Sequence, residues 1–563
     1  VLAISGLHIS LLGMGLYRLL RKRLHTRYVT AALATTVFLI SYAVLSGNGV
    51  STQRAVGMCL IYLFADVTGY AYDMLNALGI VVLVLLWENP FLLSYSGFVF
   101  SVMAVIAIGV GANVLLEWEH SWKRRQQAGE ETIKKTFFSR QKEGILVSFA
   151  IQLFTIPLVA YSYYEIPVYA MLINLFVLAV VNGLLGLTVL GVIVGMAFLP
   201  AGRVLFAPCG WMLDSYRFLC EVSLKIPGAQ RITGKPAHMR IFWYYLGLGV
   251  FLLAIYACAR RNEKHKDCRE TADLCVSRRK KRLQGIVFSC FIAFLLLFLL
   301  FPQKKSFEID FLDVGQGDGI YLCTGGGTSM FIDGGSTDVK QVGKYRILPF
   351  LKAKGVSEIS YWFVSHTDTD HVSGLKEVLV SGYRVEYLVF AKAVEKEAKT
   401  KELAELARSH GTKVLYMQAG DTVRSKRAAM RCLYPKDLDK AEDVNDLCLV
   451  LQFEEGDIRA LFGGDISTDV EEQLSRREKW DKVLIFKADH HGSRYANAEA
   501  LLKCIRPEIT VASAGKDNRY GHPSPDAVQR IKESGSRFFC TIEGGRIRVR
   551  VIENKLVCET YVK

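Results

Sequence analysis

The sequence is poor in charge and lacks regularly spaced cysteines, and each absence excludes a class of protein. Charged residues make up 22% of the 563 residues against 51% hydrophobic, and the mean hydropathy is +0.23, which argues against a disordered, collagenous or wholly soluble chain. The 13 cysteines form no CxxC pairs, so a small disulfide-stapled domain is not expected and no redox compartment is indicated. There is no GxxxxGK(S/T) run, and any nucleotide-driven motor must therefore be a separate protein.

Long apolar runs recur before residue 303 and predict membrane helices. The candidate spans are 3–20, 29–46, 54–69, 73–87, 91–115, 144–160, 166–183, 184–199, 241–258 and 285–302. A helix needs about 20 apolar residues, and at least ~17, to cross the hydrocarbon core, so 73–87 and 184–199 are the weakest candidates and suit re-entrant segments. The run 203–226 mixes charged and aromatic residues at helical spacing, which is typical of an amphipathic helix at the membrane interface.

Three loops between these runs carry much of the net charge of +15. Basic residues gather at 21–27, 123–142 and 259–284, and the last of these loops has ten Lys and Arg. The positive-inside rule places all three loops in the cytoplasm. Ten alternating spans that begin outside also place them on one side, and residues 303–563 then lie outside the cytoplasm. Nucleic-acid binding by the 259–284 loop is the alternative.

After residue 303 the pattern becomes that of an α/β domain, and one run in it is rich in metal-ligand side chains. The strand-like ISYWFVS leads into SHTDTDHVSG, which holds His366, Asp368, Asp370 and His371 within six residues before a predicted helix. Imidazole and carboxylate groups at such a turn can face one point, where two metals are held roughly 3.5–4 Å apart. A solvated acidic turn with incidental histidines is the alternative.

Three later strands also end in candidate ligands. DIRALFGGD ends in Asp465, VLIFKADHH in His490 and His491, and VASAGKDNRYGHPS delivers Asn518 and His522. Strand ends that meet at one sheet edge supply ligands while the connecting loops shape the pocket, so we expect these side chains to converge.

This order of motifs resembles the metallo-β-lactamase fold, an αββα sandwich, over roughly residues 305–560. The resemblance implies that His366 and Asp368 hold one metal, that Asp370 and His371 hold the second, and that Asp465 bridges both. His490 or His491 completes the shell, and His490 is slightly favoured because it directly ends its strand.

Two departures from the fold's usual ligands bear on the metal. Asp368 replaces the second histidine of HxHxDH, and the strand VNDLCLVL offers only Asn445 or Asp446 where another histidine ligand is usual. A site with more oxygen ligands makes Mn²⁺ or Mg²⁺ as suitable as Zn²⁺.

Two divalent ions suit hydrolysis of a phosphodiester, because they activate water and stabilise the charge of an in-line displacement. Asp370, Asp465 and His522 are the expected catalytic residues, with Asp370 orienting the attacking water. Ser493 and the His522-Pro523 turn either contact the leaving group or scissile phosphate or serve only as structural turns. β-Lactam hydrolysis needs the same activated water, so the metal site alone does not select the substrate.

The whole chain resembles the ComEC family of DNA-uptake channels. The similarity lies in LAISGLHIS at 2–10, LSGNGVSTQRA at 45–55, GFVFSVMAVIAIG at 97–109 and FLDVGQGDGIYL at 311–322, followed by HTDTDH, GGD, HHGS and the Asn518–His522–Pro523 run. It implies a multi-domain protein: a polytopic α-helical competence domain of about ten helices at 1–302, with a metallo-β-lactamase-like domain at 303–563. The family usually has an OB-like domain and a further membrane segment before these, so we expect residues to precede Val1.

The resemblance further implies a role in natural transformation. The helical region is expected to be a multi-pass channel in the bacterial cytoplasmic membrane that imports single-stranded DNA, coupled to an extracytoplasmic metal-dependent nuclease that degrades the other strand. Implied partners are DNA, double-stranded outside and single-stranded in transit, membrane lipids, an external DNA receptor and a cytoplasmic helicase or ATPase. Homo-oligomerisation is left open.

Polar residues within the apolar runs are candidates for the channel. His8 either lines a pore or cavity or reaches the membrane interface, and Arg54 either snorkels to the interface or guides phosphates at a channel mouth. Asn174 and Asn182 share one helical face and suit hydrogen bonds between helices. Two other functions are weighed: a membrane-anchored hydrolase of lipid or cell-wall phosphodiesters, and a solute transporter with a non-catalytic domain.

Overall fold

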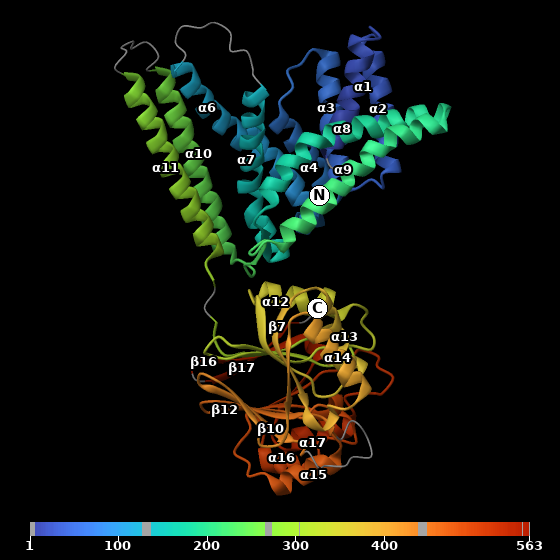
Figure 1. Ribbon diagram of the computed structural model, residues 1–563, viewed down its shortest axis with the longest axis vertical. Coiled ribbons are helices and arrows are strands. Elements are labelled where there is room, and N and C mark those ends of the chain that lie inside the picture. Colours follow the sequence, from blue (N-terminus) through green and yellow to red (C-terminus); the bar gives the residue numbers. More distant parts are fainter. Residues whose placement is uncertain are drawn as a thin grey trace. The chain divides into compact units, whose positions relative to one another are not determined.

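The chain divides into two compact units, Val1–Phe301 and Pro302–Lys563 (Figure 1). The computed structural model describes residues 6–126, 137–264, 273–302, 305–436, 447–553 and 555–561. The predicted fold class, an apolar helical region followed by an αββα sandwich, is confirmed by the helices and sheets of the two units.

The first unit is built almost entirely of helices. They are α1 (Gly6–Lys22), α2 (Tyr28–Leu45), α3 (Val50–Thr68), α4 (Met74–Glu88), η1 (Pro90–Ser94), α5 (Ser96–Ile106), η2 (Ala107–Ala112), α6 (Asn113–Gln126), α7 (Phe137–Tyr163), α8 (Ala170–Ala197), α9 (Leu199–Lys225), α10 (His238–Lys264) and α11 (Asp273–Leu300). A short antiparallel pair, β1 (Glu165–Pro167) with β2 (Gln230–Ile232), joins the ends of α7 and α9.

Five described helical stretches are long and apolar enough to cross a membrane. They are Tyr28–Leu45, Ser96–Trp122, Lys142–Tyr163, His238–Arg261 and Arg279–Leu300, and Met74–Glu88 and Gly183–Ala197 are shorter apolar stretches.

The separation of 166–183 from 184–199 was wrong, because α8 is one continuous helix from Ala170 to Ala197. Asn182 and Gly183 interrupt the apolar pattern of the sequence. Strongly apolar residues lie on both sides of them, and the helix continues through both positions. The stretch 203–226, predicted to be an amphipathic interfacial helix, lies almost entirely within α9, which packs against α8.

Two mixed sheets form the second unit. The first sheet has the order β17 (Lys555–Tyr561), β16 (Arg546–Ile552), β3 (Glu308–Phe311), β4 (Gly319–Cys323), β5 (Ser329–Asp333), β6 (Glu358–Phe363), β7 (Arg384–Ala391) and β8 (Lys413–Met417). The second has the order β15 (Arg537–Cys540), β14 (Ile509–Ala512), β13 (Ile485–Lys487), β12 (Ile458–Phe462), β11 (Val450–Glu455), β10 (Ala428–Tyr434) and β9 (Thr422–Ser425).

Apolar side chains from both sheets meet in a central core, and helices cover the outer faces. Phe311 and Leu322 of the first sheet and Phe453 and Ile485 of the second belong to one fully buried cluster. The helices η4 (Gly343–Ile347), α12 (Leu348–Ala353), α13 (Thr369–Val380) and α14 (Ala398–Ser409) cover the first sheet, and α15 (Thr468–Arg477), α16 (Glu499–Ile505) and α17 (Pro525–Glu533) cover the second. Each sheet therefore buries both faces, which explains the nearly continuous apolar strands.

Strand direction brings the motif-bearing loops to one edge of each sheet. Strands β5 and β6 are parallel, and so are β12, β13 and β14. Carboxyl ends of parallel strands share an edge, so the loops that follow them in each sheet lie together.

Candidate metal centre

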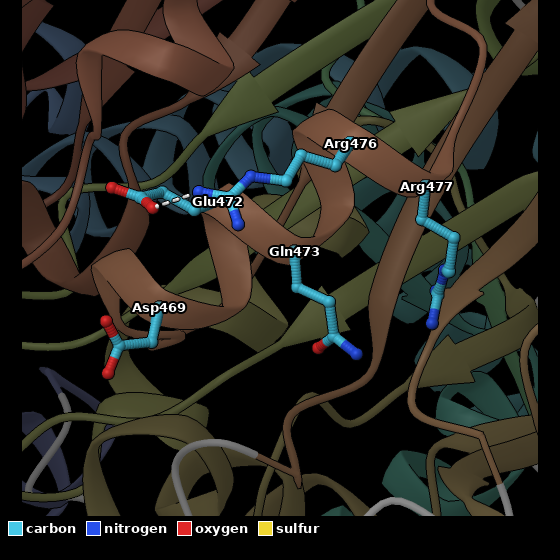
Figure 2. Close-up of a pocket in the computed structure, with 5 residues that line it drawn as sticks. All are labelled: Asp469, Glu472, Gln473, Arg476 and Arg477. Carbon is cyan, nitrogen blue, oxygen red and sulfur yellow. Dashed lines mark hydrogen bonds and ion pairs between the residues drawn. The ribbon is translucent and has the colours of Figure 1, made fainter.

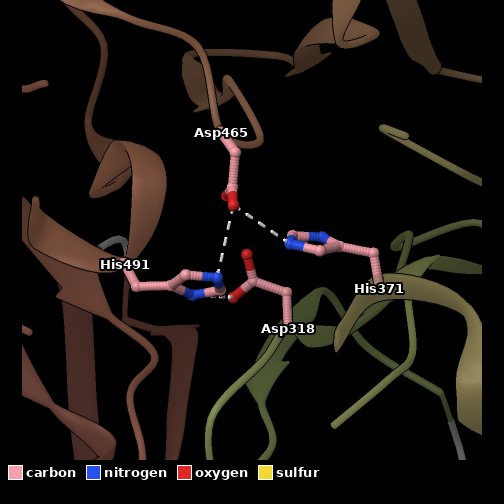
Figure 3. Close-up of side chains that lie close together, drawn as sticks. All are labelled: Asp318, His371, Asp465 and His491. Carbon is pink, nitrogen blue, oxygen red and sulfur yellow. Dashed lines mark ion pairs between the residues drawn. The ribbon is translucent and has the colours of Figure 1, made fainter. Parts of the chain in front are cut away.

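Four buried side chains from the two sheets meet at one point (Figure 3). Asp318, His371, Asp465 and His491 each offer a ligand atom, and these atoms all lie within 4.8 Å of one another. We call this group the four-residue cluster. The Oδ2 of Asp465 lies 3.4 Å from Nε2 of His371 and 3.5 Å from Nε2 of His491, and Oδ1 of Asp318 lies 3.8 Å from Nδ1 of His491.

The cluster fits a divalent cation. Within the described part of the chain, Oδ1 of Asp318, Nε2 of His371, Oδ1 of Asp465 and Nε2 of His491 are buried atoms with no hydrogen-bond partner. Leaving four such polar atoms unsatisfied in a protein interior is costly, whereas a cation could satisfy them together. Two imidazoles and two carboxylates suit Mn²⁺ and Zn²⁺ ligation, and the oxygen share also admits Mg²⁺.

The two histidines are held so that Nε2 faces the cluster. Nδ1 of His371 lies 3.0 Å from Oδ2 of Asp333, whose carboxylate also accepts hydrogen bonds from the Ser365 amide at 2.7 Å and hydroxyl at 2.8 Å. Nδ1 of His491 lies 3.0 Å from the carbonyl oxygen of Ser513. A hydrogen bond at Nδ1 places the proton there and leaves Nε2 as the ligand atom.

A buried lysine balances part of the negative charge. Nζ of Lys487, which is 1% exposed, lies 2.9 Å from Oδ2 of Asp318 and donates to the carbonyl oxygen of Ala488 at 3.0 Å. Burial would lower the pKa of Lys487, but the Asp318 carboxylate raises it, so the ammonium stays charged.

Attraction between the carboxylates and imidazoles of the cluster raises the pKa values of its histidines and lowers that of Asp465. Burial opposes charge on His491, but Asp465 and Asp318 raise its pKa to about 9; Asp465 and Asp333 likewise raise the pKa of His371 well above its usual range. The same imidazoliums hold the pKa of Asp465 well below its usual range against the effect of burial. A cation that enters must displace these two protons, so metal binding and proton release are coupled.

The remaining residues of the HTDTDH run lie around the cluster with different exposure. The ring of His366 is buried, its centroid lies 4.0 Å from that of His371, and its Nε2 is 3.9 Å from Oδ2 of Asp368. Asp368 itself is about half-exposed and pairs with Lys399 at 2.9 Å. Oδ2 of Asp370 lies 3.6 Å from Nε2 of His491; burial opposes its ionisation, but that imidazole lowers the pKa of Asp370 to about 2.

In the HHGS loop, His491 rather than His490 enters the cluster. Both residues have a positive φ, 48° and 55°, so the chain turns sharply here. His490 is 32% exposed, and its Nε2 lies 3.9 Å from Oδ2 of Asp465, at the rim. Ser493 is buried, its amide donates to the carbonyl oxygen of His490 at 2.8 Å, and its hydroxyl accepts from the Tyr495 amide at 3.3 Å, so its contacts are those of a turn.

His522 borders the cluster and an adjoining hollow. Its ring centroid lies 5.7 Å from that of His490 and 6.3 Å from that of His491. Burial and these two histidines lower the pKa of His522 to about 4, so its ring is neutral at pH 7. With α17 and β15, His522 lines a hollow of about 840 Å³. Asn445 and Asp446 lie outside the described residues.

The glycine-rich turn before β4 is packed against the backbone of the HTDTDH run. The Asp318 amide donates to the carbonyl oxygen of Asp370 at 3.1 Å. Gly317 has a φ of 148°, and a Cβ there would lie 2.5 Å from the carbonyl oxygens of Asp370 and Gly335. Only glycine permits this approach, which seats Asp318 in the cluster.

Sequence reasoning missed Asp318 and its support. Asp318 precedes a strand rather than following one, and Asp333 ends a strand without a neighbouring histidine, so neither belongs to the pattern of ligands after strands. The antiparallel pairing of Gly319 with Asp333 is what brings both to the edge that carries His371. The sequence signal was DVGQGD, where two glycines flank the turn and an acid follows directly.

The polar residues of the helical unit occupy different settings. Arg54 in α3 is buried, and its Nε lies 2.5 Å from the Ser101 hydroxyl of α5. His8 lies in α1, and Asn174 and Asn182 lie eight residues apart in α8. The contact of Arg54 thus joins α3 to α5.

A second hollow, of about 540 Å³, lies along α15 (Figure 2). Asp469, Glu472, Gln473, Arg476 and Arg477 line it, and Glu472 pairs with Arg476 at 3.0 Å. Arg477 pairs instead with Glu478 at 3.3 Å, and none of the five lining residues belongs to the four-residue cluster.

Known proteins similar to this chain agree with the predicted family resemblance. Residues 1–257 match the Competence protein family. The chain is 25% identical to ComE operon protein 3 of Bacillus subtilis, covering 98% of this chain and 67% of that one, and 24% identical to Recombination protein 2 of Haemophilus influenzae, covering 99% and 68%. The crystal structure of the metallo-β-lactamase fold protein YhfI from Bacillus subtilis is 12% identical, with a TM-score of 0.31, over 43% of this chain and 100% of that one. The family match over residues 1–257 and the two relatives aligned over nearly the whole chain confirm the resemblance to the ComEC family.

Proposed function

From its sequence similarity to competence proteins, we propose that this protein imports DNA during natural transformation. The helical unit passes a single strand across the bacterial cytoplasmic membrane, and the sandwich is an extracytoplasmic nuclease that degrades the other strand. The observation that carries the proposal is the four-residue cluster, because a buried ligand set for a divalent cation is present in a chain whose first 257 residues match a competence family.

The chain's own residues divide the work of hydrolysis. A divalent cation in the cluster would supply an activated water and neutralise phosphate charge. His371, His491, Asp465 and Asp318 would hold that ion, and in this proposal His366, Asp368 and Asp370 would hold a second one. Asp370 remains ionised at neutral pH and can accept a hydrogen bond from the attacking water.

His522 acts on the substrate rather than on the metal in this proposal. Its neutral ring lies beside His491 and borders the open hollow, where a phosphate could be reached. A neutral imidazole offers one donor to a phosphate oxygen without adding another cation next to the cluster.

Contacts within the helical unit support a common side for two of the basic loops. Nζ of Lys281, near the start of α11, lies 3.1 Å from Oε2 of Glu119, near the end of α6. The end of α6 and the first part of α11 are therefore close together, and we place the basic regions that they border in the cytoplasm with the 21–27 loop. The chain after α11 then emerges on the opposite side.

The nuclease is tested with the full chain in detergent micelles and end-labelled DNA, with Mn²⁺, Mg²⁺ or Zn²⁺ added separately. We expect cleavage by the wild type, at least about 100-fold less by Asp370→Asn, and wild-type rates for Asp469→Asn, which removes an exposed carboxylate on α15. Equal cleavage by wild type and Asp370→Asn contradicts the assignment. Inert DNA alongside hydrolysis of phosphocholine or wall phosphodiesters would instead establish the membrane-anchored hydrolase.

The channel is tested in a competent host. Deletion of the gene should abolish entry of labelled DNA into the cytoplasm, while Asp370→Asn should leave the channel intact and block strand degradation. Unchanged entry after deletion would refute the transport role.

A further inference from the structure

Three aromatic rings form a stack from the surface to the four-residue cluster. The ring centroids of Tyr520 and His522 are 5.6 Å apart with planes at 24°, and those of His522 and His491 are 6.3 Å apart at 28°. Tyr520 is 50% exposed, whereas His491 is 1% exposed. The stack therefore begins with a flat, accessible ring and ends at a candidate metal ligand.

The loop that carries Tyr520 is fixed by a single amide side chain. Oδ1 of Asn518 accepts hydrogen bonds from the amides of Tyr520 at 3.2 Å and His522 at 2.9 Å, and its Nδ2 donates to the carbonyl oxygen of Gly515 at 2.9 Å. Tyr520 is thus held in register with His522 by the backbone, before any ligand arrives. A preorganised ring costs less entropy on binding than a mobile one.

A cation lies over the tyrosine. The guanidinium carbon of Arg519 is 4.8 Å from the Tyr520 ring centroid, and its Nη2 donates to the Tyr520 hydroxyl at 2.5 Å. A guanidinium on an exposed ring is the pairing that tracks a nucleic-acid backbone beside a stacked base.

We propose that Tyr520 is a stacking platform for one unpaired base of the DNA strand being cleaved. This proposal rests on the proposed nuclease function and describes how the DNA substrate of the nuclease is bound. The base lies on the Tyr520 ring, Arg519 turns to an adjacent phosphate, and the next phosphate along the strand reaches His522 and the cluster. Bases inside a duplex are already stacked on their neighbours, so the platform selects single-stranded or frayed ends.

The test uses the full chain in micelles with EDTA, so that binding is measured without cleavage. The probe is a single-stranded oligonucleotide carrying 2-aminopurine, whose fluorescence falls when the base stacks. We expect quenching by the wild type and by Tyr520→Phe. Tyr520→Leu should lose the quenching and bind the single strand about 10-fold more weakly, with little change for a blunt duplex. Tyr345→Leu is the control, because Tyr345 is also exposed and has the Lys344 ammonium 5.0 Å from its ring centroid.

The possible results distinguish failure of the Tyr520 platform from failure of the proposed nuclease function. If the wild type cleaves DNA but Tyr520→Leu retains quenching and affinity, the platform is refuted and the nuclease stands. If Tyr520→Phe loses as much as Tyr520→Leu, the hydroxyl rather than the ring matters, and the platform is again refuted. If the wild type neither binds nor cleaves any DNA, the proposed function fails and the platform fails with it.

Discussion

Replacing Lys487 by methionine should show how much the Lys487 ammonium stabilises the buried negative charge of the four-residue cluster. Methionine keeps the length of the side chain but removes the ammonium that lies 2.9 Å from Oδ2 of Asp318. Both groups are almost fully buried, at 1% exposure each. In the protein without metal, the change leaves the buried Asp318 carboxylate without its ammonium partner. Removing one partner of a buried ion pair lowers the free energy of unfolding by about 3–5 kcal/mol.

The loss of stability in Lys487→Met can be measured by thermal unfolding of the full chain in micelles. For a unit of this size about 1 kcal/mol corresponds to roughly 2–4 °C, so Lys487→Met in EDTA should lower the unfolding temperature of the sandwich by about 6–20 °C. A divalent cation supplies the charge that the variant lacks, so added Mn²⁺ should raise the unfolding temperature more in Lys487→Met than in the wild type.

A matched surface lysine provides the control. Lys503 pairs with Glu499 one helical turn away, and both are largely exposed. Lys503→Met should change stability by less than about 1 kcal/mol, because solvent screens an exposed pair. Unfolding of Lys487→Met within about 2 °C of the wild type in EDTA would refute the reasoning, and so would an equal gain from metal in both proteins.

Three further predictions concern the support of the cluster. Asp333→Asn should weaken metal binding about 10- to 100-fold, measured by titration calorimetry, because His371 loses its orienting acceptor; unchanged affinity would dismiss that role. Burial and Glu471 raise the pKa of Asp489 well above its usual range, so this carboxyl contributes stability at low pH that is lost as pH rises from about 4 through its folded-state pKa. Denaturant unfolding of Asp489→Asn should therefore depend less on pH than that of the wild type above about pH 4, and parallel profiles would argue against a raised pKa for Asp489. Gly317→Ala should destabilise the sandwich by at least about 2 kcal/mol, since its Cβ meets backbone oxygens; an unaltered melting curve would contradict that packing.

Residues next to strand ends were the most accessible to sequence reasoning. His371, Asp465 and His491 follow β6, β12 and β13 closely, so a correct reading of local strands was enough to predict that they converge. The choice between His490 and His491 depends on two successive residues with positive φ, which no local pattern reveals. Asp318 depends on a register between β4 and β5, and Lys487 looks like an ordinary strand residue until the packing of both sheets is known.

In the helical unit, hydropathy located the apolar stretches but not their ends. A polar residue within such a stretch has the same sequence signature whether it starts a turn or faces a neighbouring helix. Asn182 lies inside α8, and Arg54 near the start of α3 contacts α5. The distinction comes from tertiary contacts, which the pattern of one segment does not contain.

The four ligands are shared evenly between the sheets, and this has a consequence for biosynthesis. Asp318 and His371 lie in segments that connect strands of the first sheet, and Asp465 and His491 in segments that follow strands of the second. The first strand of the sandwich pairs with one near the chain's end, Ile309 opposite Val549. A nascent chain holds at most half of the ligands until residue 465 has been made, and its first strand has no outer neighbour until about residue 547. Tight capture of a metal by this group of four therefore requires an essentially finished polypeptide, so the candidate site is completed only at the end of synthesis.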